Sequence, residues 1–137
     1  MTVIFVDSSA WIALSHPQET LHRQAREHYG SLPRGTHLLT SNYVLAETIT
    51  WLRYHLHHRA AVGFRALTER AVERGTLRTV WVDEGIHEAG WRIFADYEDQ
   101  TLSMTDCTSA VIARREHVDY VFAFDSDFSI LGFAVRP

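Results

Sequence analysis

The chain has 137 residues, of which 46% are hydrophobic and 22% are charged, and its formal net charge is −4 at pH 7. This length predicts one domain over residues 1–137 that buries about two-thirds of the surface of its unfolded chain. All 13 basic residues are arginine, which excludes Schiff-base chemistry and the lysine-bearing phosphate loop of P-loop NTPases. Because the net charge is negative, nucleic-acid binding requires a local arginine surface.

The composition is that expected of a cytoplasmic protein. The only cysteine is Cys107, which excludes an internal disulfide and is typical of a reducing compartment. The opening apolar run is too short for a signal peptide and has no basic flank. No segment approaches the roughly 18–20 apolar residues that a membrane span requires, so no membrane association is expected.

The first half of the chain alternates short apolar runs with amphipathic stretches. The run at residues 3–6 has no alternation of polar and apolar residues, which is typical of a strand buried on both faces. The elements predicted here are a strand at 3–6, helices at 9–14 (capped by a serine) and 19–29, a strand at 37–40, and a helix from Ser41 or Asn42 toward His57.

The second half continues the same alternation. The elements predicted here are a helix at 59–74 closed by Gly75, a strand at 77–82, a helix opened by Asp83 or Glu84, a helix opened by a capping box at 103–106, a strand at 120–124 and an edge strand at 133–135. Strands that alternate with helices indicate an α/β fold with a parallel sheet of four to five strands, rather than a barrel or a sandwich.

Two of the predicted strands end in the dipeptide Asp-Ser, at Asp7 and at Asp125. Parallel pairing of these strands would bring both carboxylates to the edge of the sheet where open α/β sheets bind their ligands. Capping of a following helix explains either aspartate alone. The pair, with Asp127 close behind, favours a functional site.

Two further acidic residues have both a structural and a functional interpretation. Asp106 lies in the first turn of a predicted helix, where the capping box with Ser103 explains it. Glu47 lies among residues that look mostly buried, so it either escapes to solvent on the Tyr43/Tyr54 face of its helix or points at a positive group.

A cluster of these carboxylates would need a cation. Two carboxylates ~5 Å apart repel by about 3 kcal/mol at an effective dielectric constant of ~20, so such a cluster raises its own pKa values or binds a metal ion. Oxygen ligands without cysteine or a histidine set select a hard ion such as Mg²⁺ or Mn²⁺. The histidines at positions 55, 57 and 58 lack a second cluster with zinc spacing and are interpreted as a solvated helix end.

Other polar and aromatic residues support no separate chemistry. Ser8, Ser9 and Thr105 lack the partners of a nucleophilic triad and are interpreted as hydrogen-bond donors around the acidic site, or as caps. The four tryptophans are expected in the core or at an interface. The arginines of the third and fourth helices form a solvated face or hold phosphates at the rim of the acidic site; they are Arg53, Arg59, Arg65, Arg70 and Arg74.

Four motifs in order resemble those of the PIN domain, and their spacing is similar to that of the VapC-type toxins of bacterial toxin–antitoxin pairs. The motifs are residues 7–9 after the first strand, Glu47, residues 102–106 and residues 125–128. The resemblance implies a three-layer α/β/α, Rossmann-like fold with strand order 3-2-1-4-5. It also implies an endoribonuclease that hydrolyses RNA with a water activated by Mg²⁺ or Mn²⁺.

The resemblance further implies which residues form the site and which partners bind. Motif positions imply a catalytic and metal-binding quartet with three auxiliary residues, namely Asp7, Glu47, Asp106 and Asp125, with Asp127, Ser9 and Thr105 beside them. Many relatives carry Thr or Ser where this chain has Ala123. The implied partners are an RNA substrate, a small antitoxin protein and a second copy of the chain.

Two alternatives remain open from the sequence. The first is a PIN-like module with little catalysis that holds RNA or a protein partner. The second is a Mg²⁺-dependent phosphatase, although a haloacid-dehalogenase-type enzyme would need an aspartate where Ser9 stands, and a receiver domain would need a late lysine.

Overall fold

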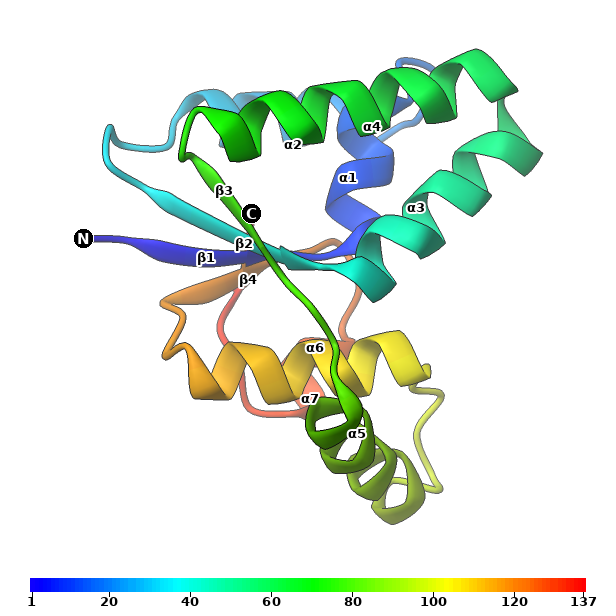
Figure 1. The fold of residues 1–137 in the computed structure, drawn as a ribbon, viewed down its shortest axis with the longest axis vertical. Helices are drawn as coiled ribbons and strands as arrows, with labels where there is room; N and C mark the ends of the chain where they lie inside the picture. Colours follow the sequence, from blue (N-terminus) through cyan, green and yellow to red (C-terminus); the bar gives the residue numbers. More distant parts are fainter.

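Five parallel strands form one sheet in the order β3-β2-β1-β4-β5 in the computed structural model, which describes all residues from 1 to 137 (Figure 1). The strands are β1 (Val3–Val6), β2 (His37–Ser41), β3 (Leu77–Val80), β4 (Tyr120–Phe122) and β5 (Val135–Arg136). The helices are α1 (Ser8–Ser15), α2 (His22–Gly30), α3 (Asn42–His55), α4 (His58–Glu73), α5 (Glu84–Asp96), α6 (Met104–Arg115) and α7 (Asp127–Ile130).

The helices cover both faces of this sheet. Figure 1 shows α1, α2, α3 and α4 on one side of the sheet and α5, α6 and α7 on the other. The predicted three-layer α/β/α architecture and the strand order are therefore confirmed. None of the helices is both long enough and apolar enough to cross a bilayer.

The central strand β1 anchors the core. Ile4, Phe5 and Val6 are completely buried, as expected for a strand that is covered by helices on both faces. Strand β1 pairs with β2 on one side and with β4 on the other, so that Phe5 lies level with Leu39 and Val121. This pairing brings the ends of the first and fourth strands together, which positions the candidate site.

Local capping signals read from the sequence are confirmed at three helix ends. Ser41 caps α3 by accepting a hydrogen bond from the Val44 amide. Ser103 and Asp106 form the predicted reciprocal capping box at the start of α6. Gly75 follows α4 with a φ of +77°, a left-handed conformation that costs glycine little and other residues more.

Several element boundaries differ from the prediction. The cap of α1 is Asp7 and not a serine, the second helix begins at His22, and β3 ends at Val80. Strand β4 ends at Phe122, which pairs with Val6, the last residue of β1. The helix α7 was not predicted, since its four residues are too few to show a helical period.

Candidate active site

The acidic residues singled out in the sequence gather at the carboxyl end of the sheet. Asp7 directly follows β1, Asp125 lies in the loop after β4, Asp106 lies in the first turn of α6, and Glu47 lies on α3. Their proximity is evident in their electrostatics, because the charge of Asp125 raises the pKa of Asp7 and the charges of Asp106 and Glu47 raise that of Asp125. The sequence prediction that these carboxylates converge is therefore confirmed, while their catalytic and metal-binding roles remain predictions.

Asp7 uses its two carboxylate oxygens differently. The residue is only 1% exposed. Its Oδ2 accepts hydrogen bonds from the Ser9 amide at 3.2 Å and from the Ser9 hydroxyl at 2.7 Å, which caps α1. Its Oδ1 is buried and has no hydrogen-bond partner. One oxygen thus serves the fold, and the other is left for a ligand, so the capping and functional interpretations are compatible.

The cluster resists its own ionisation. Burial raises the pKa of Asp7 from its ordinary value of 3.8 to about 7, with repulsion from Asp125 and Asp106 adding to the shift. Burial is also the first cause of the raised pKa values of Asp106, Asp125 and Asp127. Repulsion from neighbouring carboxylates contributes at each of them. A bound cation would reverse this penalty, because it stabilises the charged form of every carboxylate around it.

Glu47 is held by a residue that the sequence did not single out as its partner. The Ser8 hydroxyl donates a hydrogen bond of 2.7 Å to Glu47 Oε1. Ser8 is 7% exposed, whereas Glu47 is exposed. Glu47 therefore does lie at the surface, but a hydroxyl of α1 fixes its carboxylate toward the acidic cluster. Only the pair of adjacent serines after Asp7 could have signalled this contact.

Ser9 joins the two strand ends that carry the aspartates. Its hydroxyl donates to Asp7 Oδ2 at 2.7 Å and accepts from the Phe124 amide at 3.1 Å, next to Asp125. The Asp7 amide also donates to the carbonyl of Phe122 at 3.0 Å. Ser9, predicted as an auxiliary residue, is therefore a structural bridge between the first and fourth acidic motifs.

Asp106 and Asp127 complete the cluster from the other face of the sheet. Asp106 Oδ2 accepts from the Ser103 amide at 3.0 Å, so this aspartate is a cap as well as a member of the acidic group. The Asp127 amide donates to Asp125 Oδ1 at 3.2 Å. Thr105 is half-buried in the same turn of α6 as Asp106. Ala123 is buried directly after β4.

The residues present fit a hard divalent cation. All the clustered side chains are carboxylates, and the unpaired Asp7 Oδ1 is an oxygen ligand without a partner. No three Asp, Glu, His or Cys side chains are close enough together to form a complete ligand set. This arrangement suits Mg²⁺, which keeps several waters and usually takes one or two carboxylates.

The remaining side chains considered in the sequence lie outside this cluster. His57 caps α4 and His55 stacks on Trp51, in agreement with a solvated helix end. Cys107 is fully buried, which raises the pKa of its thiol to about 11. Among the tryptophans Trp11 lies in the core, whereas Trp81 is 70% exposed and Trp91 is 50% exposed.

The fold and this acidic edge define the class of protein. Residues 4–134 match the PIN domain family, and the chain belongs to that family. It is 35% identical over 136 residues to the 23S rRNA-specific endonuclease VapC20 of Mycobacterium tuberculosis, covering 98% of this chain and 99% of that protein.

Solved structures of similar proteins have the same fold as this chain. The crystal structure of M. tuberculosis VapC20, a sarcin–ricin loop cleaving toxin, superposes with a TM-score of 0.86 at 34% identity, covering 98% of this chain and 99% of that one. VapBC2 from Rickettsia felis has a TM-score of 0.71 at 9% identity, with 98% of each chain covered. A toxin–antitoxin complex from Klebsiella pneumoniae has a TM-score of 0.65 at 15% identity, covering 98% and 96%. The latter two show likeness of fold alone.

Proposed function

We propose that this chain is a VapC-type toxin, an endoribonuclease that hydrolyses RNA phosphodiester bonds with a water activated by Mg²⁺ or Mn²⁺. The observation that carries the proposal is the buried, unpartnered oxygen of Asp7 among like charges, in a chain homologous over almost its whole length to an rRNA endonuclease. A divalent ion at this edge would lower the pKa of a bound water and stabilise the charge that develops on the phosphate.

The protein residues have distinct roles in this proposal. Asp7 and Asp106 would hold the ion directly, and Asp125 would hold it directly or through a water. Glu47 would orient the attacking water and accept its proton, because Ser8 holds its carboxylate toward the cluster. Asp127 at the start of α7 and Thr105 in the first turn of α6 would support the site. Ser9 would keep Asp7 and the Asp125 segment together.

Ribosomal RNA is the substrate that the homology favours. VapC20 is described as specific for 23S rRNA and as cleaving the sarcin–ricin loop. An identity of 35% across 98% of the chain supports the same class of substrate for this protein. The expected product is a single cut in 23S rRNA at that loop.

A small antitoxin and a second copy of the chain are the proposed protein partners. Several similar folds come from toxin–antitoxin assemblies, which supports the antitoxin. An arginine from such a partner would enter the acidic cluster and offset its repulsion, which would block the metal. Exposed large apolar side chains such as Trp81 and Trp91 support burial against a second copy. Light scattering of the purified chain tests the dimer.

The activity is tested with purified protein, intact ribosomes and isolated 23S rRNA. Cleavage is expected with Mg²⁺ or Mn²⁺ and should disappear with EDTA and in Asp7→Asn. Asp96→Asn, which neutralises an exposed aspartate at the end of α5, is the matched control and should retain full activity. Cleavage that persists in EDTA or in Asp7→Asn would overturn the assignment.

A further inference from the structure

The turn between α3 and α4 carries a concentration of basic side chains. This region, residues 53–59, is called the α3–α4 corner, and its basic side chains are Arg53, His55, His57, His58 and Arg59. The sequence between Glu47 and Glu69 contains no acidic residue. The corner is therefore a positive surface on a chain whose net charge is −4.

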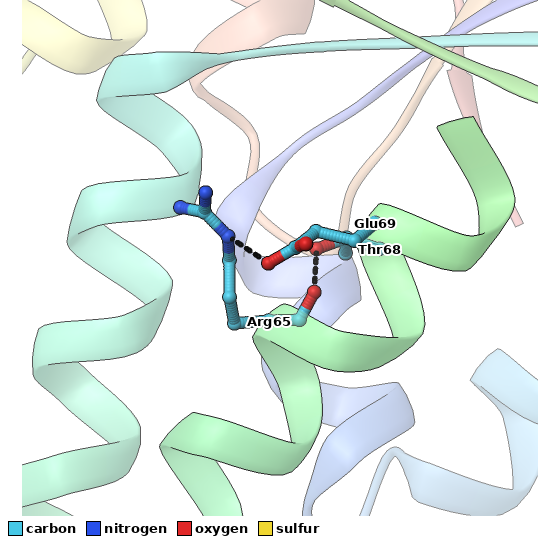
Figure 2. A network of polar contacts seen from close by, with 3 residues as sticks. All are labelled: Arg65, Thr68 and Glu69. Atoms are coloured by element: carbon cyan, nitrogen blue, oxygen red, sulfur yellow. Dashed lines mark hydrogen bonds and ion pairs between the residues drawn. The ribbon is translucent and has the colours of Figure 1, made fainter. Parts of the chain in front are cut away.

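The two arginines of the corner are free of carboxylate partners. Arg53 and Arg59 are exposed and take part in no ion pair. The next arginine along α4 is different, because Arg65 Nε binds Glu69 Oε1 at 2.7 Å, one turn away (Figure 2). The charge of Arg65 is thus neutralised by Glu69, whereas the charges of the two corner arginines remain unpaired and can meet a polyanion.

The corner is connected to the acidic cluster by one face of α3. Tyr54 is seven positions after Glu47, which returns it to the same side of the helix about 10 Å farther along the axis. Its side chain is 81% exposed. Figure 1 shows α3 leading away from the sheet to its junction with α4. A single strand leaving the cluster along this face would meet Tyr54 and then the arginines.

Aromatic packing and capping hold the corner in shape. The His55 ring stacks on Trp51 with centroids 4.2 Å apart and planes 9° apart, and its Nδ1 contacts the Trp51 carbonyl at 3.0 Å. The His57 ring accepts a hydrogen bond from the Ala60 amide through Nδ1, which fixes the start of α4. Because these contacts use Nδ1, Nε2 of each exposed ring is available to a ligand.

We propose that the α3–α4 corner binds RNA phosphates, with Arg53 and Arg59 as the charged contacts and Tyr54 as a stacking platform for a base. The proposal rests on the proposed function and extends its substrate site beyond the scissile phosphate. The arginines supply affinity through release of counterions, and an exposed aromatic ring stacks on any base. The acidic cluster repels RNA, so the corner provides the attraction that the cluster lacks.

The test measures RNA binding without cleavage. The Asp7→Asn protein is titrated into a fluorescent sarcin–ricin loop RNA, and the dissociation constant is followed by anisotropy over a series of KCl concentrations. Adding Arg53→Gln and Arg59→Gln should weaken binding at least tenfold at low salt. The slope of log K against log[KCl] should fall by about 0.7 for each arginine removed. Tyr54→Ala should weaken binding while leaving the slope unchanged.

A matched control separates the corner from net charge. Arg26→Gln with Arg34→Gln removes the same charge from two exposed arginines that also take part in no ion pair, and should leave the slope unchanged. An equal slope in the corner variant and the Asp7→Asn parent, with circular dichroism showing both folded, would overturn the proposal. Equal loss of slope in both double variants would also overturn it. Failure of the proposed function is distinct, because it would show as no cleavage by the wild-type chain.

Discussion

Two neighbouring turns of α6 differ in how they contribute to stability: one carries repelling carboxylates, and the other is closely packed against α5. At Asp106 the helix contributes a carboxylate to a group of like charges, and burial and mutual repulsion raise the pKa values of Asp106 and Asp125. At Thr108 the same helix packs so closely on α5 that a Cβ at Gly90 would lie 2.7 Å from Thr108 Cγ2. The first region is unfavourable until something binds, and the second is complete in the folded chain.

The difference shows that the fold leaves polar groups without partners at the acidic edge, where a ligand can bind, and not at the α5–α6 contact. The α5–α6 contact is packed from both sides and leaves no room for another atom at Gly90. The acidic edge keeps Asp7 Oδ1 buried and unpaired, which costs stability in the absence of a ligand. Substitutions in the two regions should therefore have opposite effects on activity and on stability.

The largest expected effect is on catalysis at the acidic edge. Asp7→Asn should lower RNA cleavage by about 10³-fold or more, because a metal contributes several kcal/mol of transition-state stabilisation. The same change should not lower the thermal midpoint without metal, since it removes a buried carboxylate whose ionised form the site disfavours. Single-turnover cleavage and calorimetry measure the two quantities. A large drop in thermal midpoint would mean that the Asp7 charge serves the fold.

The next effect is the pH dependence of stability at the same edge. The pKa of Asp7 is raised to about 7, so the folded state favours the protonated form. The stability this form confers is complete below about pH 4 and is lost as the pH rises to about 7, a change of up to about 4 kcal/mol. Urea titrations in EDTA should show this decline, and Asp7→Asn should flatten it. Millimolar Mg²⁺ should oppose it in the wild type by binding the ionised cluster.

The packed region is tested by enlarging Gly90. Gly90→Ala should destabilise the chain by about 1–3 kcal/mol, because the new methyl group would press on Thr108 side-chain and backbone atoms. Gly63→Ala in α4 is the control, since no atom lies within 4 Å of its Cβ, and it should stabilise by about 0.5–1 kcal/mol. Urea unfolding distinguishes them. A neutral or stabilising effect of Gly90→Ala would show that α5 and α6 can separate without cost.

The smallest effect is expected where the acidic edge meets α1. Ser8→Ala removes the hydroxyl that orients Glu47 and should lower kcat about tenfold with little change in KM, since a hydrogen bond to a charged group contributes about 1.5–3 kcal/mol. Ser15→Ala in the last turn of the same helix should leave kcat unchanged. Recovery of activity in Ser8→Thr would identify the hydroxyl as the cause, whereas equal kcat in Ser8→Ala and the wild type would contradict the role of Ser8.

Sequence reasoning predicted the features that depend on repeated local signals. The buried run of β1, the capping box of α6 and the left-handed Gly75 each follow from a few adjacent residues. The strand order came from the family resemblance and not from periodicity. The four-residue helix α7 was missed because one turn leaves no periodic trace.

What the sequence could not supply was the partner of each polar group. The sequence is compatible with Asp7 as either a cap or a ligand, and only the structure shows that its two oxygens allow both, since Oδ2 accepts from Ser9 and Oδ1 has no partner. The contact of Ser8 with Glu47 joins residues 39 positions apart, which no local pattern encodes. The exposure of Trp81 depends on where β3 ends, and the predicted boundary was two residues too late.

The bridge made by Ser9 has a consequence for folding of the chain during translation. It joins residues 115 positions apart, and β1 has no neighbour on the β4 side until that strand has left the ribosome. A nascent or truncated chain that ends before residue 120 lacks both Asp125 and the bond that holds it beside Asp7. Such long-range pairing forms late in folding. A chain that is proposed to cleave ribosomal RNA would therefore complete its acidic cluster only after its last strands have left the ribosome.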